Sequence, residues 1–279
     1  MLRIGRIPYI NTYPVYGAVD RGIVPLDATL INGVPSALNA QMATGELDVS
    51  VVSAVEYAAH AERYLLLPDL AISCDGPVRS VMLFSKRPVE ELHGATVLVS
   101  RSSMTSVELL SLLFAERWGV TPTLVPADAE RADIQHFAAE SHDARLVIGD
   151  AALLLSSGTS VVGEAYPHQI DLGAAWKEWT GLPFVFAVWV AQRSTPVAAA
   201  LGAHASLIAS RDWGVTHLAV LAEQAAETTG VARETCQAYL SGLDYRLSLP
   251  HLRGLTEFYR RLDAAGRVQA RPLVFLSAA

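Results

Sequence analysis

The chain opens with Leu2-Arg3-Ile4-Gly5-Arg6-Ile7-Pro8-Tyr9-Ile10-Asn11-Thr12-Tyr13-Pro14, an apolar strand pattern that runs directly into a polar loop. Pro8 and Pro14 cannot donate a ladder hydrogen bond, and each restricts the residue before it, so we expect the strand to end near Ile7. Tyr9 and Asn11 then lie on a stiff loop at the carboxyl end of a strand, where ligands bind in open α/β sheets. A plain surface loop, in which Asn11 bonds its own backbone, is the alternative.

Length and composition indicate a globular protein with one large domain or two of ordinary size. The chain has 279 residues, of which 51% are hydrophobic and 18% are charged, so we expect a large core and no extensive disorder. The formal net charge is −7 and Lys and Arg form no cluster, which argues against a nucleic-acid-binding surface. An anionic ligand would therefore have to be held by local hydrogen-bond donors.

The sequence shows no signal for export, for a membrane span, for a metal site or for a nucleotide site, and each absence argues against one class of protein. The start of the chain has no long apolar segment with a cleavage site, and the apolar runs at 146–155 and 184–191 are too short or interrupted to span a membrane. We therefore expect a cytoplasmic protein. Cys74 and Cys236 match no metal spacing and are expected to be reduced core thiols. The histidines form no metal-binding pair and no glycine-rich nucleotide motif occurs, so neither a metal nor an organic cofactor is expected.

The alternation of strand and helix patterns predicts an α/β fold with two lobes. Strand patterns continue as far as 184–191, and the rest of the chain is helical, including an Ala-rich helix that we expect to end at Gly214. We expect a first lobe of residues 1–84 plus 191–279 and a second lobe of residues 85–190, joined by a two-strand hinge beside a central cleft. This is the layout of a type 2 periplasmic-binding-protein fold.

Two helix starts that are rich in hydroxyl groups are candidates for binding a carboxylate. The stretches Ser53–Glu56 and Thr105–Glu108 fit capping boxes, in which a hydroxyl caps the helix and the Glu reaches back to the cap amide. A helix N-terminus also attracts anions, and Ser102, Ser103 and Ser106 add donors around the second start. Plain capping explains both stretches as well, so both interpretations stay open.

Two polar residues and one aromatic stretch are further candidates for the cleft. Ser80 lies in an apolar strand pattern at the expected start of a crossing segment, where it either faces the cleft or bonds a neighbouring strand. Asp150 follows a buried strand of the second lobe and either binds substrate or acts as a helix cap or structural carboxylate. The tryptophan-rich stretch 171–187 forms either a core patch between the lobes or an apolar wall for a ring-shaped ligand.

Seven segments, spread over most of the chain, form a recognisable series: Ile10–Pro14, Gly33–Asn39, Gly45–Val49, Ser53–Tyr57, Ser80–Val81, Ile148–Leu153 and Trp176–Phe186. In this order and spacing they resemble the chorismate dehydratase family of the futalosine route to menaquinone. The resemblance implies a cytosolic enzyme without a cofactor that eliminates water from chorismate to give 3-[(1-carboxyvinyl)oxy]benzoate. It also implies that Asn11 and Ser80 match the active-site Asn and Ser of the family.

The implied reaction removes the proton at ring C3 and the hydroxyl at C4, and aromatisation drives it. An amide is not a usable base near neutral pH, so we expect Asn11 to hold the substrate and steer the proton, while the base is the substrate's own enolpyruvyl carboxylate or an enzyme group. Ser80 is expected to bond a carboxylate or the leaving hydroxyl. The other expected substrate-binding residues are Tyr9, Ser53, Ser102, Ser103, Thr105, Ser106, Gly149 and Asp150.

Three other functions are alternatives. The sister enzyme of the same route, 1,4-dihydroxy-6-naphthoate synthase, shares the fold, but its early Ser-Pro-Cys-Pro-Asn stretch is absent here. A carboxylate-binding solute receptor would need an export signal or lipid anchor, and the effector domain of a regulator would need a helix-turn-helix before the lobes; neither is visible. We expect a small-molecule substrate, no nucleic-acid or membrane partner, and a monomer or homodimer.

Overall fold

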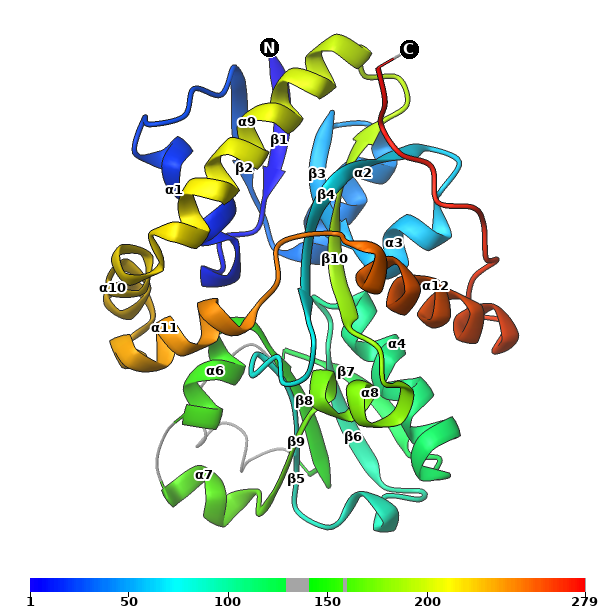
Figure 1. The fold of residues 1–279 in the computed structure, drawn as a ribbon. Helices are drawn as coiled ribbons and strands as arrows, with labels where there is room; N and C mark the ends of the chain where they lie inside the picture. The colour runs from blue at the N-terminus through cyan, green and yellow to red at the C-terminus, as the bar shows by residue number, and fades with distance from the viewer. Residues whose placement is uncertain (129–140, 158–159, 279) are drawn as a thin grey trace.

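Two five-stranded sheets, each flanked by helices, form the two halves of the molecule (Figure 1). The structure is a computed structural model that describes residues 1–128, 141–157 and 160–278. The two-lobed α/β architecture expected from the sequence is confirmed.

The elements have the following bounds. The first sheet contains β1 (Leu2–Arg6), β2 (Ala28–Asn32), β3 (Val49–Ser53), β4 (Tyr64–Cys74) and β10 (Phe184–Gln192). The second sheet contains β5 (Val81–Ser85), β6 (Thr96–Ser100), β7 (Thr123–Ala127), β8 (Ala144–Ile148) and β9 (His168–Asp171). The helices are η1 (Ile10–Thr12), α1 (Tyr13–Asp20), α2 (Pro35–Thr44), α3 (Ala54–Ala59), η2 (Val89–Glu91), α4 (Met104–Leu112), the π-helical η3 (Leu113–Trp118), α6 (Gly149–Ser157), α7 (Ser160–Ala165), α8 (Leu172–Thr180), α9 (Val197–Thr216), α10 (Leu218–Thr229), α11 (Arg233–Gly242) and α12 (Leu249–Ala264).

Both sheets follow the same strand plan, with the orders β2-β1-β3-β10-β4 and β7-β6-β8-β5-β9. The first three strands of each are parallel. The fourth strand, β10 or β5, is antiparallel to its neighbours on both sides. Polar side chains that follow β1 and β3 therefore lie at the carboxyl ends of one parallel set, and those after β6 and β8 lie at the carboxyl ends of the other.

The chain passes between the sheets at two short connections, residues 75–80 and residues 181–183. The pairing keeps the whole of β5 in the second sheet and the whole of β10 in the first. We therefore propose that the lobes divide at these connections, a few residues before the limits at 84 and 190 expected from the sequence.

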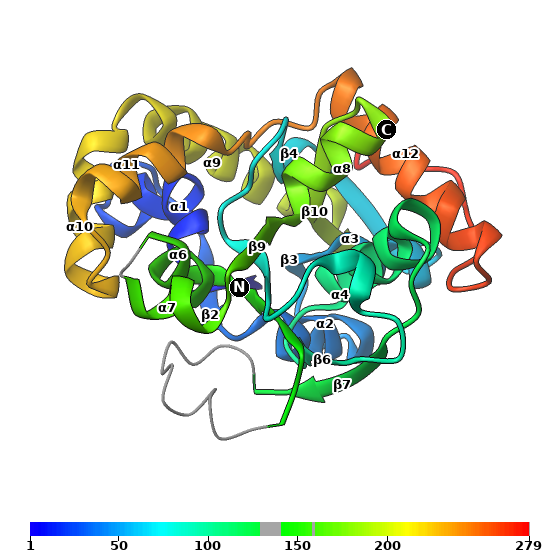
Figure 2. The same cartoon turned by 90° about the horizontal axis from the view of Figure 1, so that it is seen from below.

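β10 is the most enclosed strand, and all nine of its residues are buried. Helices α3, α8 and α12 pack against it, which explains its continuous apolar sequence. Seen from below (Figure 2), α9, α10 and α11 gather around α1 on one side of the molecule, and α12 lies beside α3 and α4 on the other. The helical C-terminal part of the chain therefore covers the first sheet, as the sequence predicts.

Gly214 does not end a helix, contrary to the prediction, because α9 continues to Thr216. A Cβ atom at Gly214 would lie only 2.1 Å from the carbonyl oxygen of Pro14. The glycine therefore allows α9 to pack closely against the start of α1. This packing requirement looks the same in the sequence as a helix-ending glycine.

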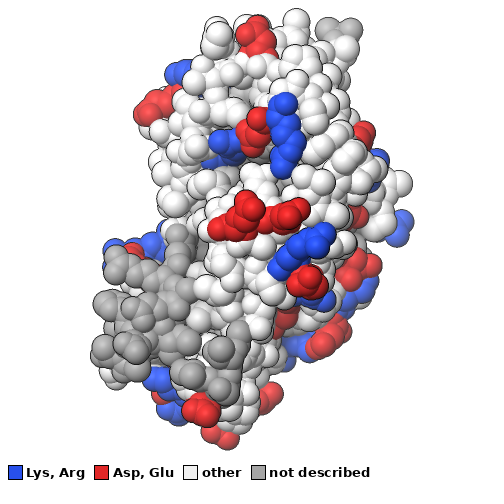
Figure 3. Space-filling view, turned by 90° about the vertical axis from the view of Figure 1, so that its left-hand side faces the viewer, with Lys and Arg blue, Asp and Glu red and all other residues white. Residues whose placement is uncertain are grey.

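The surface and the cysteines fit the expected class of protein. On the face shown in Figure 3, acidic and basic side chains lie near one another within a largely uncharged surface. Cys74 and Cys236 are both buried and unpaired, as expected. Within the described ranges, none of the helices has the length and apolar character needed to cross a bilayer.

Candidate active site

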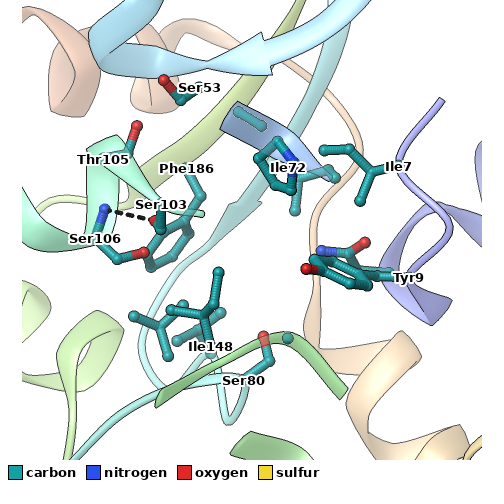
Figure 4. Close-up of a pocket in the computed structure, with 16 residues that line it drawn as sticks. Ile7, Tyr9, Ser53, Ile72, Ser80, Ser103, Thr105, Ser106, Ile148 and Phe186 are labelled. Carbon is teal, nitrogen blue, oxygen red and sulfur yellow. Dashed lines mark hydrogen bonds between the residues drawn. The ribbon is translucent and has the colours of Figure 1, made fainter. Parts of the chain in front are cut away.

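A pocket with about 610 Å³ of empty space, its open mouth included, lies between the two sheets (Figure 4). The predicted site residues that line it are Tyr9, Asn11, Ser53, Ser80, Ser103, Thr105, Ser106 and Gly149. Apolar side chains complete the lining: Phe186 and Ala187 come from the stretch 171–187 proposed as an apolar wall, and the sequence did not assign Ile7, Pro35, Ile72, Val78, Val81 and Ile148. Ser102 and Asp150 are not among the described lining residues.

The loop after β1 is fixed by Thr12, a residue whose role the sequence did not reveal. Its buried hydroxyl lies 2.9 Å from the carbonyl oxygens of both Ile7 and Tyr9, so that its single proton is shared between the two acceptors. This shared bond closes the loop into the short helix η1, which begins directly after Tyr9. Tyr9 and Asn11 are thus presented to the pocket by a rigid turn rather than by a mobile surface loop.

Asn11 carries the clearest chemical signal in the pocket. Its Oδ1 atom is buried and has no hydrogen-bond partner among the described residues. An unpaired buried acceptor is destabilising by about 1–3 kcal/mol, and such groups are rare in native proteins. Asn11 lines the pocket, so a hydrogen-bond donor of a ligand or a bound water can satisfy this acceptor.

Ser53 caps α3 as predicted, since its hydroxyl accepts from the amide of Glu56 at 3.1 Å. The other predicted bond of the capping box, from the Ser53 amide to the Glu56 carboxylate, is wrong. The Glu56 carboxylate accepts from the hydroxyl of Tyr64 at 2.9 Å, while the Ser53 amide donates to Asn39 Oδ1 at 3.3 Å. The Asn39 amide group also donates to the Ser53 hydroxyl, at 3.2 Å. A buried network, not a local box, therefore positions Ser53.

The second hydroxyl cluster starts α4, but its cap is Ser103 and not Thr105. Ser103 Oγ accepts from the Ser106 amide at 3.2 Å. Thr105 Oγ1 instead accepts from the Val55 amide at 3.2 Å and so joins the start of α4 to the start of α3 across the two sheets. In Figure 4 the hydroxyls of this cluster lie on one side of the pocket and Tyr9 lies on the other. The capping interpretation is confirmed for Ser103, and carboxylate binding by the cluster stays a prediction, although Ser103, Thr105 and Ser106 line the pocket.

Ser80 lies immediately before β5 rather than within it, because Arg79 has a left-handed backbone with a φ of 63° that interrupts the extended chain. The Ser80 carbonyl oxygen accepts from the Gly149 amide at 2.8 Å. The Ser80 hydroxyl accepts from the hydroxyl of Tyr239 at 2.8 Å. Ser80 is 4% exposed and its position is therefore fixed at both its backbone and its side chain.

Gly149 and Asp150 bring the second sheet against the loop after β1. Gly149 has a φ of 66°, and a Cβ atom there would lie 3.3 Å from the Tyr9 ring. Asp150 Oδ1 accepts from the Ile10 amide at 3.3 Å. Burial raises the pKa of Asp150 to about 6, although the bond from Ile10 opposes the rise. Asp150 therefore positions the loop that carries Asn11.

The described lining contains no charged side chain. Helices α4 and α6 direct their N-termini towards the pocket, since Ser103, Thr105, Ser106 and Gly149 line it. An α-helix N-terminus carries about half a positive charge and donates from its first amides, so it stabilises an anion without a cation. The part of the chain that the structure describes contains no group of three His, Cys, Asp or Glu side chains placed to bind a metal.

The tryptophan-rich stretch forms a core patch, with one exception. Trp176 is fully buried, donates to the Pro183 carbonyl oxygen at 3.2 Å and contacts Phe184 with ring centroids 5.2 Å apart. No tryptophan is among the described lining residues, but Phe186 from the same stretch is. Phe186 thus supplies the aromatic wall that the sequence led us to expect from the tryptophans.

Comparisons with known proteins agree with this architecture. A solved protein of Archaeoglobus fulgidus superposes with a TM-score of 0.78 and 20% identity, covering 96% of this chain and 98% of that one. A Candida albicans protein, described as having the generic periplasmic binding protein fold, superposes with a TM-score of 0.64 and 10% identity, covering 100% and 98%. The chain therefore has the periplasmic-binding-protein-like fold expected from its sequence.

Sequence comparisons identify the family. A chorismate dehydratase of Thermus thermophilus is 32% identical over 272 residues, which is 91% of this chain and 95% of that enzyme. A chorismate dehydratase of Campylobacter jejuni is 28% identical over 187 residues, covering 66% and 64% of the two chains. The family model described as menaquinone biosynthesis matches residues 2–264. With a pocket between two lobes and a match over nearly its whole length, the chain belongs to the menaquinone biosynthesis family.

Proposed function

We propose that this protein is a chorismate dehydratase, which converts chorismate into 3-[(1-carboxyvinyl)oxy]benzoate and water. The observation that carries the proposal is the 32% identity to the Thermus enzyme over 91% of this chain. The pocket independently supports a ligand of this kind. Chorismate is a small ring with two carboxylates and a hydroxyl, and the lining combines apolar walls with hydroxyls and helix N-termini.

The electrostatics of the pocket suit an anionic transition state. Loss of the C3 proton moves negative charge towards the ring carboxylate. Dipoles and donors that are already oriented stabilise such charge without reorganisation. In the proposed complex the start of α4, with Ser103 and Ser106, holds one carboxylate. The apolar walls, including Phe186 and Ile148, contact the ring and exclude water.

The residues that line the pocket support one of the two candidate bases. No Asp, Glu or His occurs among the described lining residues, and Asp150 is bonded to Ile10. This favours the substrate's own enolpyruvyl carboxylate as the base that takes the C3 proton. Asn11 then holds the substrate in the conformation in which this carboxylate reaches the proton, with its buried Oδ1 accepting from the C4 hydroxyl.

The leaving group needs a proton, because hydroxide is a poor leaving group. Ser80 lines the pocket, which supports a role in which it donates a hydrogen bond to the C4 hydroxyl or to a neighbouring carboxylate oxygen. One C–H bond and one C–O bond break, the ring gains a double bond and becomes aromatic, and the removed proton and hydroxyl leave as water. No electrons are exchanged with another molecule.

The first test is incubation of the purified, EDTA-treated protein with chorismate, followed by chromatography with mass detection. A product that is lighter by one water and absorbs like a substituted benzoate is the expected result. Chorismate that stays unchanged but raises the melting temperature would instead indicate a binding protein. Chorismate that neither reacts nor binds would contradict the proposal.

Two finer expectations belong with this function. We expect the protein to act in the cytoplasm and to be a monomer or a homodimer. Cell fractionation tests the first expectation, and sedimentation of the purified protein tests the second.

A further inference from the structure

We propose that Tyr239 is a positioning residue that directs the hydroxyl proton of Ser80 into the pocket, an inference that rests on the proposed function. Tyr239 lies on α11, 159 residues after Ser80 in the sequence, and its hydroxyl is 2.8 Å from Ser80 Oγ. The two residues are 2% and 4% exposed, so the bond is shielded from bulk solvent. Tyr239 itself is not among the described lining residues, and therefore acts through Ser80.

The direction of the hydrogen bond decides what Ser80 can do. A serine hydroxyl has one proton and two acceptor sites, and Tyr239 is the partner of Ser80 Oγ within the described part of the chain. When Tyr239 donates, the Ser80 proton has no protein acceptor and is available to the ligand. The reverse arrangement would leave the phenol proton buried without an acceptor, which is unfavourable.

Two properties of Tyr239 support its role as the donor. A phenol is a stronger acid than an aliphatic alcohol, and it is therefore the better donor of the two. Burial raises the pKa of Tyr239 far above its usual range, so its hydroxyl keeps its proton at any working pH. A hydroxyl that accepts a hydrogen bond also becomes a better donor, so Tyr239 strengthens the bond from Ser80 to the substrate.

A matched control lies close by in the sequence. Tyr245 is also 2% exposed, but its buried hydroxyl has no hydrogen-bond partner among the described residues, and it is absent from the described pocket lining. Tyr245→Phe therefore removes the same oxygen atom as Tyr239→Phe without breaking a bond to the site.

The experiment is a double-mutant cycle with Tyr239→Phe, Ser80→Ala and the double variant, alongside Tyr245→Phe. Steady-state kinetics with chorismate and thermal unfolding are measured for each. We expect Tyr239→Phe to lower kcat roughly 3- to 10-fold with KM changed by less than about 2-fold, the effect of one lost hydrogen bond. Tyr245→Phe should keep the wild-type kcat. In the Ser80→Ala background, Tyr239→Phe should cause no further loss.

Other results would overturn the inference. If Tyr239→Phe kept full activity, or lowered kcat by the same factor with and without Ser80, Tyr239 would not act through Ser80. If Tyr239→Phe alone failed to fold, a kcat of the double variant below that of Ser80→Ala would still overturn the inference, because removing both partners leaves no unpaired buried hydroxyl. A wild-type protein without dehydratase activity would refute the proposed function as well. An active wild type with additive losses would refute only this inference.

Discussion

The two sheets share one strand plan but present different chemistry at equivalent places. β1 and β6 are the middle strands of the two parallel sets. β1 leads into an aromatic and an amide, Tyr9 and Asn11, whereas β6 leads into the hydroxyls that start α4. An amide on a rigid turn suits orientation of a reacting group, and a helix start with hydroxyls suits anchoring of a carboxylate. Under the proposed function, we therefore expect the loop after β1 to direct the reaction and the start of α4 to bind the substrate.

The loops after β1 and β3 also differ from the start of α4 in the hydrogen bonds that hold them in place. On the first sheet, the shared bond of Thr12 and the two bonds of Asn39 fix the loops after β1 and β3. On the second sheet, Ser103 makes a single capping bond and is only partly buried. We therefore expect changes in these two loops to act mainly on kcat and changes at the start of α4 to act mainly on KM.

Asn11→Ala is the largest expected effect. Removing the group that orients the reacting carboxylate should lower kcat by about 100- to 1,000-fold, as for other groups that act in the transition state. KM should change far less. Asn32→Ala is the control, because Asn32 is exposed at the end of β2, accepts a hydrogen bond from Arg6 and is not among the described lining residues. Activity retained in Asn11→Ala would remove the distinction between the loop after β1 and the start of α4.

Asp150→Asn tests how the second sheet holds the loop after β1. The pKa of Asp150 is raised to about 6 by burial, so the folded protein binds this proton more tightly than the unfolded chain does. The stability from this group is therefore complete below about pH 4 and declines as the pH rises through 6, by about 1–3 kcal/mol. Urea unfolding should show that Asp150→Asn flattens this decline.

Asp48→Asn is the matched control for Asp150→Asn, because the pKa of Asp48 is shifted in the opposite direction. The hydrogen bond from Arg3 holds the pKa of Asp48 below its usual value, so the stability from Asp48 is present above about pH 4 and is lost on acidification. The two variants should therefore change the pH dependence in opposite directions. Parallel changes would show that Asp150 is not held in its protonated form by burial.

Gly149→Ala tests the contact between the sheets. A left-handed alanine is destabilising by about 1 kcal/mol, and its Cβ atom would also press on the Tyr9 ring at 3.3 Å. Gly45→Ala has the same backbone strain, with a φ of 76°, but no atom within 4 Å. Both variants should lose similar stability in urea unfolding, and only Gly149→Ala should lower kcat/KM. Equal activity in the two variants would mean that Tyr9 tolerates displacement.

The caps give the smallest expected effect. Ser53→Ala should destabilise by about 1–2 kcal/mol, since Ser53 bonds both Glu56 and Asn39. Ser103→Ala removes one bond at a partly exposed site and should destabilise by about 0.5–1 kcal/mol, while raising KM more than it lowers kcat. Urea unfolding and steady-state kinetics measure both. A reversed order of stabilities would contradict the view that the loops of the first sheet are held more firmly than the start of α4.

The site was predictable from sequence where the signal is local. Pro8 and Pro14 marked the loop that carries Asn11, and Ser53 is a cap in both the pattern and the structure. Local patterns failed where a distant residue competes. The carboxylate of Glu56 bonds Tyr64 instead of the cap amide, and Thr105 bonds Val55 on the other sheet.

Other features of the structure could not be predicted from a single sequence. Nothing near position 239 indicates a partner for Ser80, because the bond depends on how α11 packs. Gly214 looks like a helix end, although its role is a close approach to Pro14. β4 contains Pro68 and a left-handed Asp69, which obscured it as a strand, and such interruptions are tolerated because β4 is at the edge of its sheet.

The return of the chain to the first sheet, where it adds β10, has a consequence for how the protein folds during synthesis. The second sheet is built from residues 81–171 and can be completed as soon as they have left the ribosome. The first sheet begins with the earliest residues but lacks β10, its strand between β3 and β4, until residue 192 has been synthesised. Domains tend to fold as units during synthesis. The first sheet is therefore started first and completed last, and β3 and β4 each keep an unpaired edge until β10 has been synthesised.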